Sequence, residues 1–374
     1  MKNFFYFLLS VMLCILLVGG IYVATQDNTN TKPPDDSQSN SSVVEDGSSN
    51  SGSTDGENSS TDGTDSETES GTENSGNNDG DNAGENTDDA GLKEPSNVSM
   101  YLANGLTMQT GAQLSMEERA LRFTCDITTE LYNEVQADTS KSLGMLVMPR
   151  KFFDQVNTEN YTYIDWIKAF DAAGLNSYIY HVYEDSGIGT TGSGYYMRIK
   201  LYDIGFGAIN QEIVALGVLA TTATNGNVTY KYSALPTGVT YRDNARSMAY
   251  VAAATLNAQV LGMANHSADD VAVLKGYIND SVDKANGKTE ATDDGSMYAF
   301  TTNITAPQKL SIGESFTVVT TISPNVNVPV WYRSSDESVI EVDESGKVTA
   351  KGKGTAVVGV YVAGESYGIT VTVS

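Results

Sequence analysis

Beyond residue 96 the chain consists mainly of short runs in which apolar and polar residues alternate, the period of a half-buried β-strand. The alternation in 195–202 predicts that Met197, Ile199 and Leu201 face the core. The run 143–148, apolar on both faces and stopped by Pro149, predicts a central strand. In all, the pattern predicts strands at 121–128, 143–148, 177–183, 195–202, 213–220 and 228–232.

A longer period, with apolar residues three or four positions apart, predicts three helices in the same region. The first follows 162–165, which resembles a capping box, and ends at Gly174. The second is the alanine-rich run 245–261. The third begins with a second capping-box pattern at 267–270. Only a few residues separate the last two helices, so we expect them to form an antiparallel pair against or beside the sheets.

The last 75 or so residues return to short alternating runs separated by turn residues. We expect one inward face that ends at Pro324, with the members Phe316, Val318, Thr320 and Ile322. The segment Val330-Trp331-Tyr332 is expected to supply the central aromatic side chain of the core. A turn at 344–346 and closing strands at 357–362 and 369–373 complete the predicted sandwich.

The stretch from Val330 to Val360 contains the pattern W-Y-x-S-S-D-x-S-V-I-x-V-D-x-x-G-x-V-T-A-x-x-x-G-T-A. With it, residues 301–374 resemble the bacterial immunoglobulin-like domain, group 2. The resemblance implies a structural module of bacterial surface proteins and carries no catalytic residues.

The region before it resembles an uncharacterised domain of surface proteins from gut Firmicutes, through A-L-R-F-T-C-D-I, G-M-L-V-M-P and A-R-S-M-A-Y-V-A-A-A. No activity comes with that second resemblance.

The N-terminal quarter has a different composition. Residues 4–23 are apolar behind Lys2 and long enough to cross a bilayer, so they predict a membrane anchor, with a cleaved signal peptide as the alternative. Residues 26–95 contain 18 Asp and Glu, two Lys and no aromatic residue. Such a segment cannot bury enough apolar surface to offset its chain entropy. We therefore expect a disordered acidic linker that spaces the folded part from the membrane.

The net charge of −25 argues against nucleic acid as a partner, because phosphate binding needs clusters of Lys and Arg. Cys14 lies in the apolar run and Cys125 in a predicted strand, so no disulfide within one domain is expected. Cys125 alternates with Phe123 and Ile127, which predicts a small core residue rather than a reactive thiol.

Motifs for catalysis or cofactor binding are weak. The segment 187–192 fits G-x-G-x-x-G, but a strand follows it, whereas a dinucleotide site requires a helix there. The two histidines, His181 in a predicted strand and His266 before a helix, are too few for a metal site or a catalytic triad. We therefore expect no cofactor, no metal and no catalytic residues. A pair of carboxylates set by distance in space is not visible in a sequence.

Tyrosine is enriched in the β-rich half of the middle region. Tyrosine suits strands, so packing alone explains much of this enrichment. The alternation nevertheless places Tyr196, Arg198, Lys200 and Tyr202 on the strand face that points away from the core. Aromatic rings beside polar groups hold carbohydrate or protein ligands. We therefore select Tyr196, Arg198 and Tyr202 as candidate ligand-binding residues.

Together these patterns predict a mainly β protein with four parts: a membrane segment at 1–25, a linker at 26–95, a β-rich domain with a C-terminal helix pair at 96–288, and an immunoglobulin-like β-sandwich at 297–374. The leading hypothesis is a bacterial cell-surface protein, tethered by residues 4–23, that binds a glycan, wall polymer or protein without catalysis. The alternatives are an extracellular carbohydrate-active hydrolase and a purely structural spacer.

Overall fold

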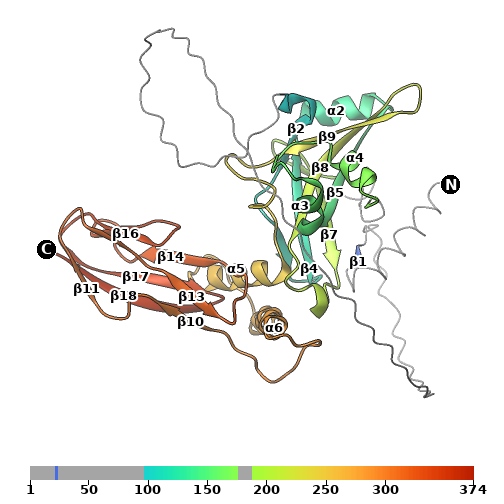
Figure 1. The fold of residues 1–374 in the computed structure, drawn as a ribbon. Helices are drawn as coiled ribbons and strands as arrows, with labels where there is room; N and C mark the ends of the chain where they lie inside the picture. The colour runs from blue at the N-terminus through green and yellow to red at the C-terminus, as the bar shows by residue number, and fades with distance from the viewer. Residues whose placement is uncertain (1–21, 24–96, 176–187) are drawn as a thin grey trace, which may run out of the picture. The chain divides into compact units, whose positions relative to one another are not determined.

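The computed structural model describes residues 22–23, 97–175 and 188–374. The protein is mainly β, as predicted. Its first part contains a nine-stranded sheet in the order β1-β7-β4-β2-β9-β8-β5, with β3 paired to β4 and β6 to β7 (Figure 1). The strands are β1 (Tyr22–Val23), β2 (Leu102–Met108), β3 (Gln113–Ser115), β4 (Ala120–Ile127), β5 (Lys141–Pro149), β6 (Ile188–Thr191), β7 (Gly194–Tyr202), β8 (Ile213–Thr222) and β9 (Val228–Ala234).

Helices accompany this sheet, and α2 lies at one of its ends (Figure 1). The helices are η1 (Val98–Met100), α2 (Thr129–Ala137), α3 (Arg150–Val156), α4 (Trp166–Ala172), η3 (Phe206–Ala208), α5 (Met248–Val260) and α6 (Ala268–Ala285). The capping box predicted for α6 is confirmed, since Ser267 and Asp270 satisfy each other's backbone N–H groups. None of the helices in the described ranges is long and apolar enough to cross a membrane. The predicted anchor falls on residues 4–23, of which 4–21 lie outside the described residues.

The strands β4 and β7 confirm the predicted alternation. Phe123 pairs with Ile199 and Cys125 with Met197 on the face that turns inward, and all four side chains are buried. Strands β8 and β9 also confirm the sequence pattern, and a turn at 224–226 joins them. The predicted strand 177–183, with His181, lies outside the described residues.

The prediction that 143–148 forms a central strand was wrong. Strand β5 lies at the end of the sheet order and pairs with β8. Seven consecutive residues of β5, from Leu143 to Pro149, are nevertheless buried. Helices α2 and α3 both contact β5, so helices rather than two flanking strands supply this burial.

The first predicted helix begins later than its sequence pattern suggests. The N-cap of α4 is Asp165, whose side chain accepts a hydrogen bond from the backbone N–H of Lys168. Thr162 instead lies in the loop before the helix, where its carbonyl accepts from the indole N–H of the buried Trp166. The predicted end is confirmed, because Gly174 follows the helix with a φ of 71°.

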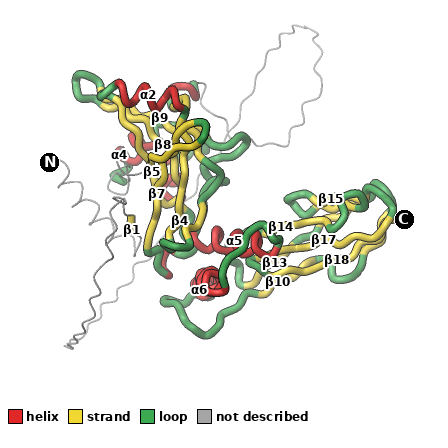
Figure 2. Tube along the Cα trace, turned by 180° about the vertical axis from the view of Figure 1, so that it is seen from behind, coloured by secondary structure: helices red, strands yellow, loops and turns green. Residues whose placement is uncertain are grey.

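The C-terminal part consists of short strands in three sheets, with the orders β10-β13, β11-β18-β17-β14 and β12-β16-β15 (Figure 2). Its buried residues are almost all Val, Ile and Ala, as the alternating runs predicted. The strands are β10 (Ala299–Thr302), β11 (Gln308–Leu310), β12 (Ser315–Thr317), β13 (Thr320–Ser323), β14 (Val330–Ser334), β15 (Ile340–Val342), β16 (Lys347–Ala350), β17 (Gly354–Val362) and β18 (Glu365–Val373).

The structure confirms and refines two predictions for this part. Val318 is buried, Phe316 and Ile322 pack against the core, and the residues that alternate with this face are exposed, so the inward face is as predicted. The face is shared by two strands, because the chain leaves β12 at Val318 and enters a different sheet with β13. The core aromatic comes from the predicted segment 330–332 as Tyr332, whereas Trp331, half-buried, lies on the opposite face of β14 because adjacent side chains of a strand alternate.

The helix pair shares its core with the C-terminal sandwich. Leu256 of α5 and Leu274, Ile278 and Val282 of α6 belong to the same buried cluster as the sandwich residues. The N-terminal half of α5, with Met248, packs instead with the nine-stranded sheet. One helix therefore contributes to both cores.

Candidate functional site

The candidate residues lie on the face of β4 and β7 that points away from the buried core. The antiparallel register places Lys200 opposite Arg122, Arg198 opposite Thr124, and Tyr196 opposite Asp126. We call this surface the outer strip. It consists of Arg122 and Asp126 on β4, with the buried Thr124 between them, and of Tyr196, Arg198, Lys200 and Tyr202 on β7.

Arg198 and Tyr196 form one preassembled unit of the outer strip. The guanidinium carbon of Arg198 lies 4.0 Å from the centroid of the Tyr196 ring, a cation–π geometry. The same guanidinium donates a hydrogen bond to the Tyr196 hydroxyl at 3.3 Å. Both side chains are half-buried. Strand pairing and this mutual contact restrict their conformations before any ligand arrives.

Glu118 neutralises the far end of the outer strip. Its carboxylate forms an ion pair of 2.6 Å with Lys200 and accepts hydrogen bonds from Ser115 and Tyr202. Partial burial raises the pKa of Glu118, but the bonds from Lys200, Ser115 and Tyr202 outweigh that effect and leave the pKa below its ordinary value. Burial and the neighbouring Glu118 charge raise the pKa of Tyr202 to about 12. Tyr202 is therefore a neutral hydroxyl at physiological pH.

Arg122 places a second arginine diagonally across the strand pair from Arg198. It donates a hydrogen bond to the side-chain carbonyl of Gln113 on β3. Burial and the like charge of Arg198 lower the pKa of Arg122. The Nε atoms of Arg122 and Arg198 are buried, and neither has a hydrogen-bond partner among the described residues. An unsatisfied buried donor is unfavourable, so the two Nε–H groups are a polar cost that the folded strip carries.

A groove of about 520 Å³ borders the outer strip at Arg122, between β3 and α5. We call it the arginine groove. Arg246, Tyr250 and His266 also line it, and its lining contains no Asp or Glu in the described structure. The Arg246 guanidinium lies over the Tyr250 ring with its carbon 4.8 Å from the centroid, so it is held in place.

A second groove, of about 510 Å³, lies at the other end of β4, where the strand meets α2 and the β6–β7 hairpin. We call it the polar groove. Hydroxyl groups from Thr107, Thr128, Thr129, Thr191 and Ser193 line it, together with the amide of Gln109 and the carboxylates of Asp126 and Glu130. Asp126 accepts a hydrogen bond of 3.0 Å from Gln109. Because Asp126 belongs to both features, the polar groove continues the outer strip.

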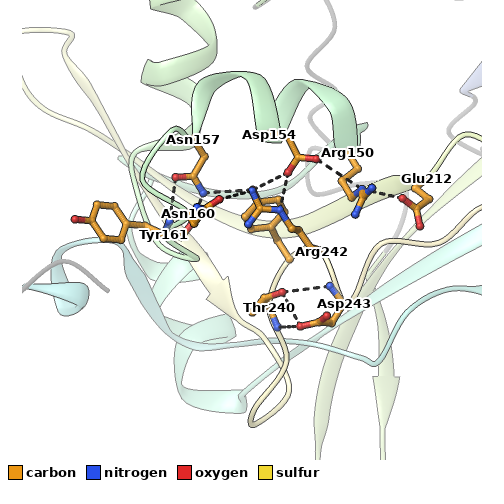
Figure 3. A network of polar contacts seen from close by, with 10 residues as sticks. Arg150, Asp154, Asn157, Asn160, Tyr161, Glu212, Thr240, Arg242 and Asp243 are labelled. Atoms are coloured by element: carbon orange, nitrogen blue, oxygen red, sulfur yellow. Dashed lines mark hydrogen bonds and ion pairs between the residues drawn. The ribbon is translucent and has the colours of Figure 1, made fainter. Parts of the chain in front are cut away.

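The ion pairs around α3 provide a contrast (Figure 3). Arg242 contacts Asp154 at 2.8 Å and donates to Asn160, while Arg150 contacts Glu212 at 2.7 Å. Each guanidinium there faces a carboxylate, as expected of a network that stabilises a fold. Arg122 and Arg198 are instead diagonal neighbours in the β4–β7 register, and their like charges interact unfavourably.

The structure thus brings Tyr196 and Arg198 into contact and places Tyr202 two residues beyond Lys200 on the same strip. Sequence reasoning missed Arg122, Glu118 and Arg246. Arg122 alternates with the predicted core residues Leu121 and Phe123, so the sequence predicts that its side chain points outward. The sequence does not predict that β4 pairs with β7. His266 borders the arginine groove, as a loop residue before α6.

The strand after the glycine motif and the burial of Cys125 agree with the sequence predictions. Residues 188–191 form β6, which pairs with β7 as a hairpin, so no helix follows the glycine motif. Cys125 is fully buried, as predicted, and burial raises the pKa of its thiol. Within the described ranges, no cluster of three or more His, Cys, Asp or Glu side chains is arranged to hold a metal ion.

Comparison with known proteins identifies the C-terminal part. Residues 327–364 match the family model of the intimin immunoglobulin-like domain, so the chain carries a bacterial immunoglobulin-like domain there. No curated protein matches the chain. The resemblance noted for the middle region remains a prediction.

Several solved structures align weakly with the chain. An intimin mutant from EHEC O157:H7 shares 20% identity over 20% of this chain and 45% of its own, with a TM-score of 0.17. Domains 1–6 of the surface layer protein SbsC share 10% identity over 73% of this chain and 26% of their own, with a TM-score of 0.17. The four N-terminal Ig domains of Dscam1 isoform 4.44 share 8% identity over 71% of this chain and 53% of their own, with a TM-score of 0.16. The alignment thus spans less than half of the intimin and SbsC chains.

Proposed function

We propose that this protein is a bacterial cell-surface protein that binds a ligand without catalysis, through the outer strip of its middle domain. The intimin-like domain at 327–364 supports a surface protein of the adhesion type. The apolar run 4–23 and the acidic linker support tethering to the outer face of the membrane, with the folded part held away from it.

The observation that carries this proposal is the preassembled pair of Arg198 and Tyr196 on paired strands. A binding surface gains affinity when its side chains are ordered before the ligand arrives, because less conformational entropy is lost on binding. Tyrosine and arginine are also the residue types that contribute most at binding surfaces. The outer strip offers both types on a rigid sheet.

The test is retention of the full-length protein, in mild detergent, on immobilised glycans, peptidoglycan and extracellular matrix proteins. We expect retention on at least one of these surfaces, and loss of retention in the double variant Tyr196→Ala/Tyr202→Ala. The matched control is Tyr367→Ala, because Tyr367 is a 40% exposed tyrosine on β18, away from the outer strip. Binding that is equal in all three proteins would place the site elsewhere, and no binding to any surface would contradict the adhesion proposal.

One observation favours a second candidate, a carbohydrate-active hydrolase. The polar groove contains two carboxylates, Asp126 and Glu130, and glycoside hydrolysis uses such a pair. Asp126, however, already accepts a hydrogen bond from Gln109, which favours a positioning role. Release of reducing sugars from polysaccharides that Asp126→Asn and Glu130→Gln both abolish would establish the hydrolase. A purely structural spacer would show neither binding nor turnover.

A further inference from the structure

We infer that the ligand of the outer strip is an acidic polysaccharide, with a carboxylate or sulfate group held between Arg122 and Arg198 and its chain running from the arginine groove to the polar groove. This inference rests on the proposed binding function and specifies its ligand.

The anionic group follows from the two guanidinium groups. Like charges held close together on a half-buried surface repel one another, and each buried Nε lacks an acceptor in the described part of the chain. An anionic group bound beside the two guanidinium groups would offset this repulsion. Arginine is suited to this role because its planar fork matches the geometry of a carboxylate or a similar anion.

Neighbouring charges support the same conclusion. Glu118, an acidic group beside the strip, is already paired with Lys200 at 2.6 Å and does not neutralise both arginines. Arg246 adds a further positive charge in the arginine groove. This cluster occurs in a chain with a net charge of −25, so general basicity does not explain it.

The extended shape follows from the two grooves. Arg122 borders the arginine groove, and Asp126, four residues further along β4, borders the polar groove. Their separation along the strand is about 13 Å, from the rise of ~3.3 Å per residue. A polymer can contact both sites at once, whereas a single small anion can occupy only one of them.

The composition of the polar groove favours sugar over peptide. The polar groove presents hydroxyl, amide and carboxylate groups, which pair with sugar hydroxyls. Protein interfaces are instead centred on large apolar anchors. Among the described residues, the exposed large apolar side chains include none from β2, β4, β6, β7 or α2, the elements around the polar groove.

The experiment measures retention of the full-length protein on four immobilised probes: polygalacturonate, heparin, dextran and poly-glutamate. Polygalacturonate carries carboxylates and heparin carries sulfates as well, so these two probes distinguish the sources of the anion. Dextran is a neutral glycan, and poly-glutamate is an acidic chain without sugar. The variants are Arg122→Gln/Arg198→Gln and the charge-conserving Arg122→Lys/Arg198→Lys.

The matched control is Arg333→Gln/Lys351→Gln, which removes the same charge from exposed positions of the C-terminal sandwich. Circular dichroism and protection of the buried Cys125 thiol would show that each variant is folded. We expect at least one acidic glycan to be retained about tenfold or more better than dextran and poly-glutamate. Retention of the glutamine variant on that glycan should fall about tenfold or more, and retention of the lysine variant should fall less. Retention of the control should not change.

Other outcomes overturn the inference in distinguishable ways. If dextran retains the protein as well as the acidic glycans do, or if the arginine variants do not change retention, the ligand need not be anionic. The proposed binding function would still stand. Retention on poly-glutamate equal to that on the glycans removes the sugar requirement. Binding to none of the four probes, with binding to another surface in the broader panel, refutes the ligand class alone.

Discussion

Gly364, in the turn between β17 and β18, donates its backbone N–H to the side-chain oxygen of Asn257 on α5 at 2.8 Å. The amide of Asn257 also donates to the carbonyl of Pro329 at 3.1 Å. Asn257 is fully buried, and its side chain in α5 forms hydrogen bonds with backbone groups of the sandwich. The contact between helix pair and sandwich is therefore specified by hydrogen bonds as well as by apolar burial.

The first prediction concerns Asn257→Ala. This change leaves the N–H of Gly364 and the carbonyl of Pro329 without their partner, and each unsatisfied buried group costs about 1–3 kcal/mol. We expect the protein to lose at least about 2 kcal/mol of stability, measured by calorimetry of the full chain. Asn225→Ala, at an exposed turn, is the control and should cost well under half of that. Equal effects in the two variants would contradict the role assigned to Asn257.

A second prediction concerns the segment after α6, where the buried carboxylate of Asp283 binds Lys288 at 2.7 Å and the backbone and hydroxyl of Thr292. The bond from Lys288 is the largest of the effects that lower the pKa of Asp283. A lowered folded-state pKa contributes stability above the unfolded value of about 4, and this contribution is lost as the pH falls through the folded value.

Asp283→Asn should therefore be less stable than the natural protein at pH 7, and the difference should shrink as the pH falls from about 4 to 2. Urea unfolding at a series of pH values measures this. Glu290→Gln, an exposed change in the same segment, should show no such convergence. A difference that stays constant with pH would exclude the charge of Asp283 as the cause.

The third prediction is that Gly217→Ala destabilises the sheet. A Cβ atom at position 217 would lie 2.5 Å from the sulfur of Cys125 and 3.0 Å from the end of Met197. Overpacking of a buried site costs about 1–3 kcal/mol. We expect a loss of that size in thermal unfolding, with faster labelling of Cys125 in a Cys14→Ser background. Gly192→Ala, where no atom lies within 4 Å, is the matched control and should be close to neutral.

The fourth prediction tests the charge balance of the outer strip. Glu118→Gln removes the carboxylate that pairs with Lys200 and leaves a more positive surface beside Arg122. If the ligand is an acidic polysaccharide, retention should rise by a few fold and should become more sensitive to salt. Glu344→Gln, in an exposed turn of the sandwich, should change neither property. Weaker retention in Glu118→Gln would indicate that Glu118 itself contacts the ligand.

The sequence alone determined the strands whose residues alternate and the helices whose caps are local. Met197, Ile199 and Leu201 turn inward because a strand has a period of two, and Ser267 caps α6 because its partner Asp270 is three residues away. The motif after Val330 likewise identified the immunoglobulin-like domain, since its turns and alternation are local features. Tyr196, Arg198 and Tyr202 could be placed on one outward face for the same reason.

Tertiary structure decided what those elements contact. The edge position of β5 and the split of 316–322 between two sheets depend on pairing between distant strands. The approach of Arg122 to Arg198 joins residues 76 positions apart through the register of β4 and β7. A local pattern gives the direction of each side chain, but only the register gives its neighbour. The outer strip could therefore be identified only from the pairing of β4 with β7.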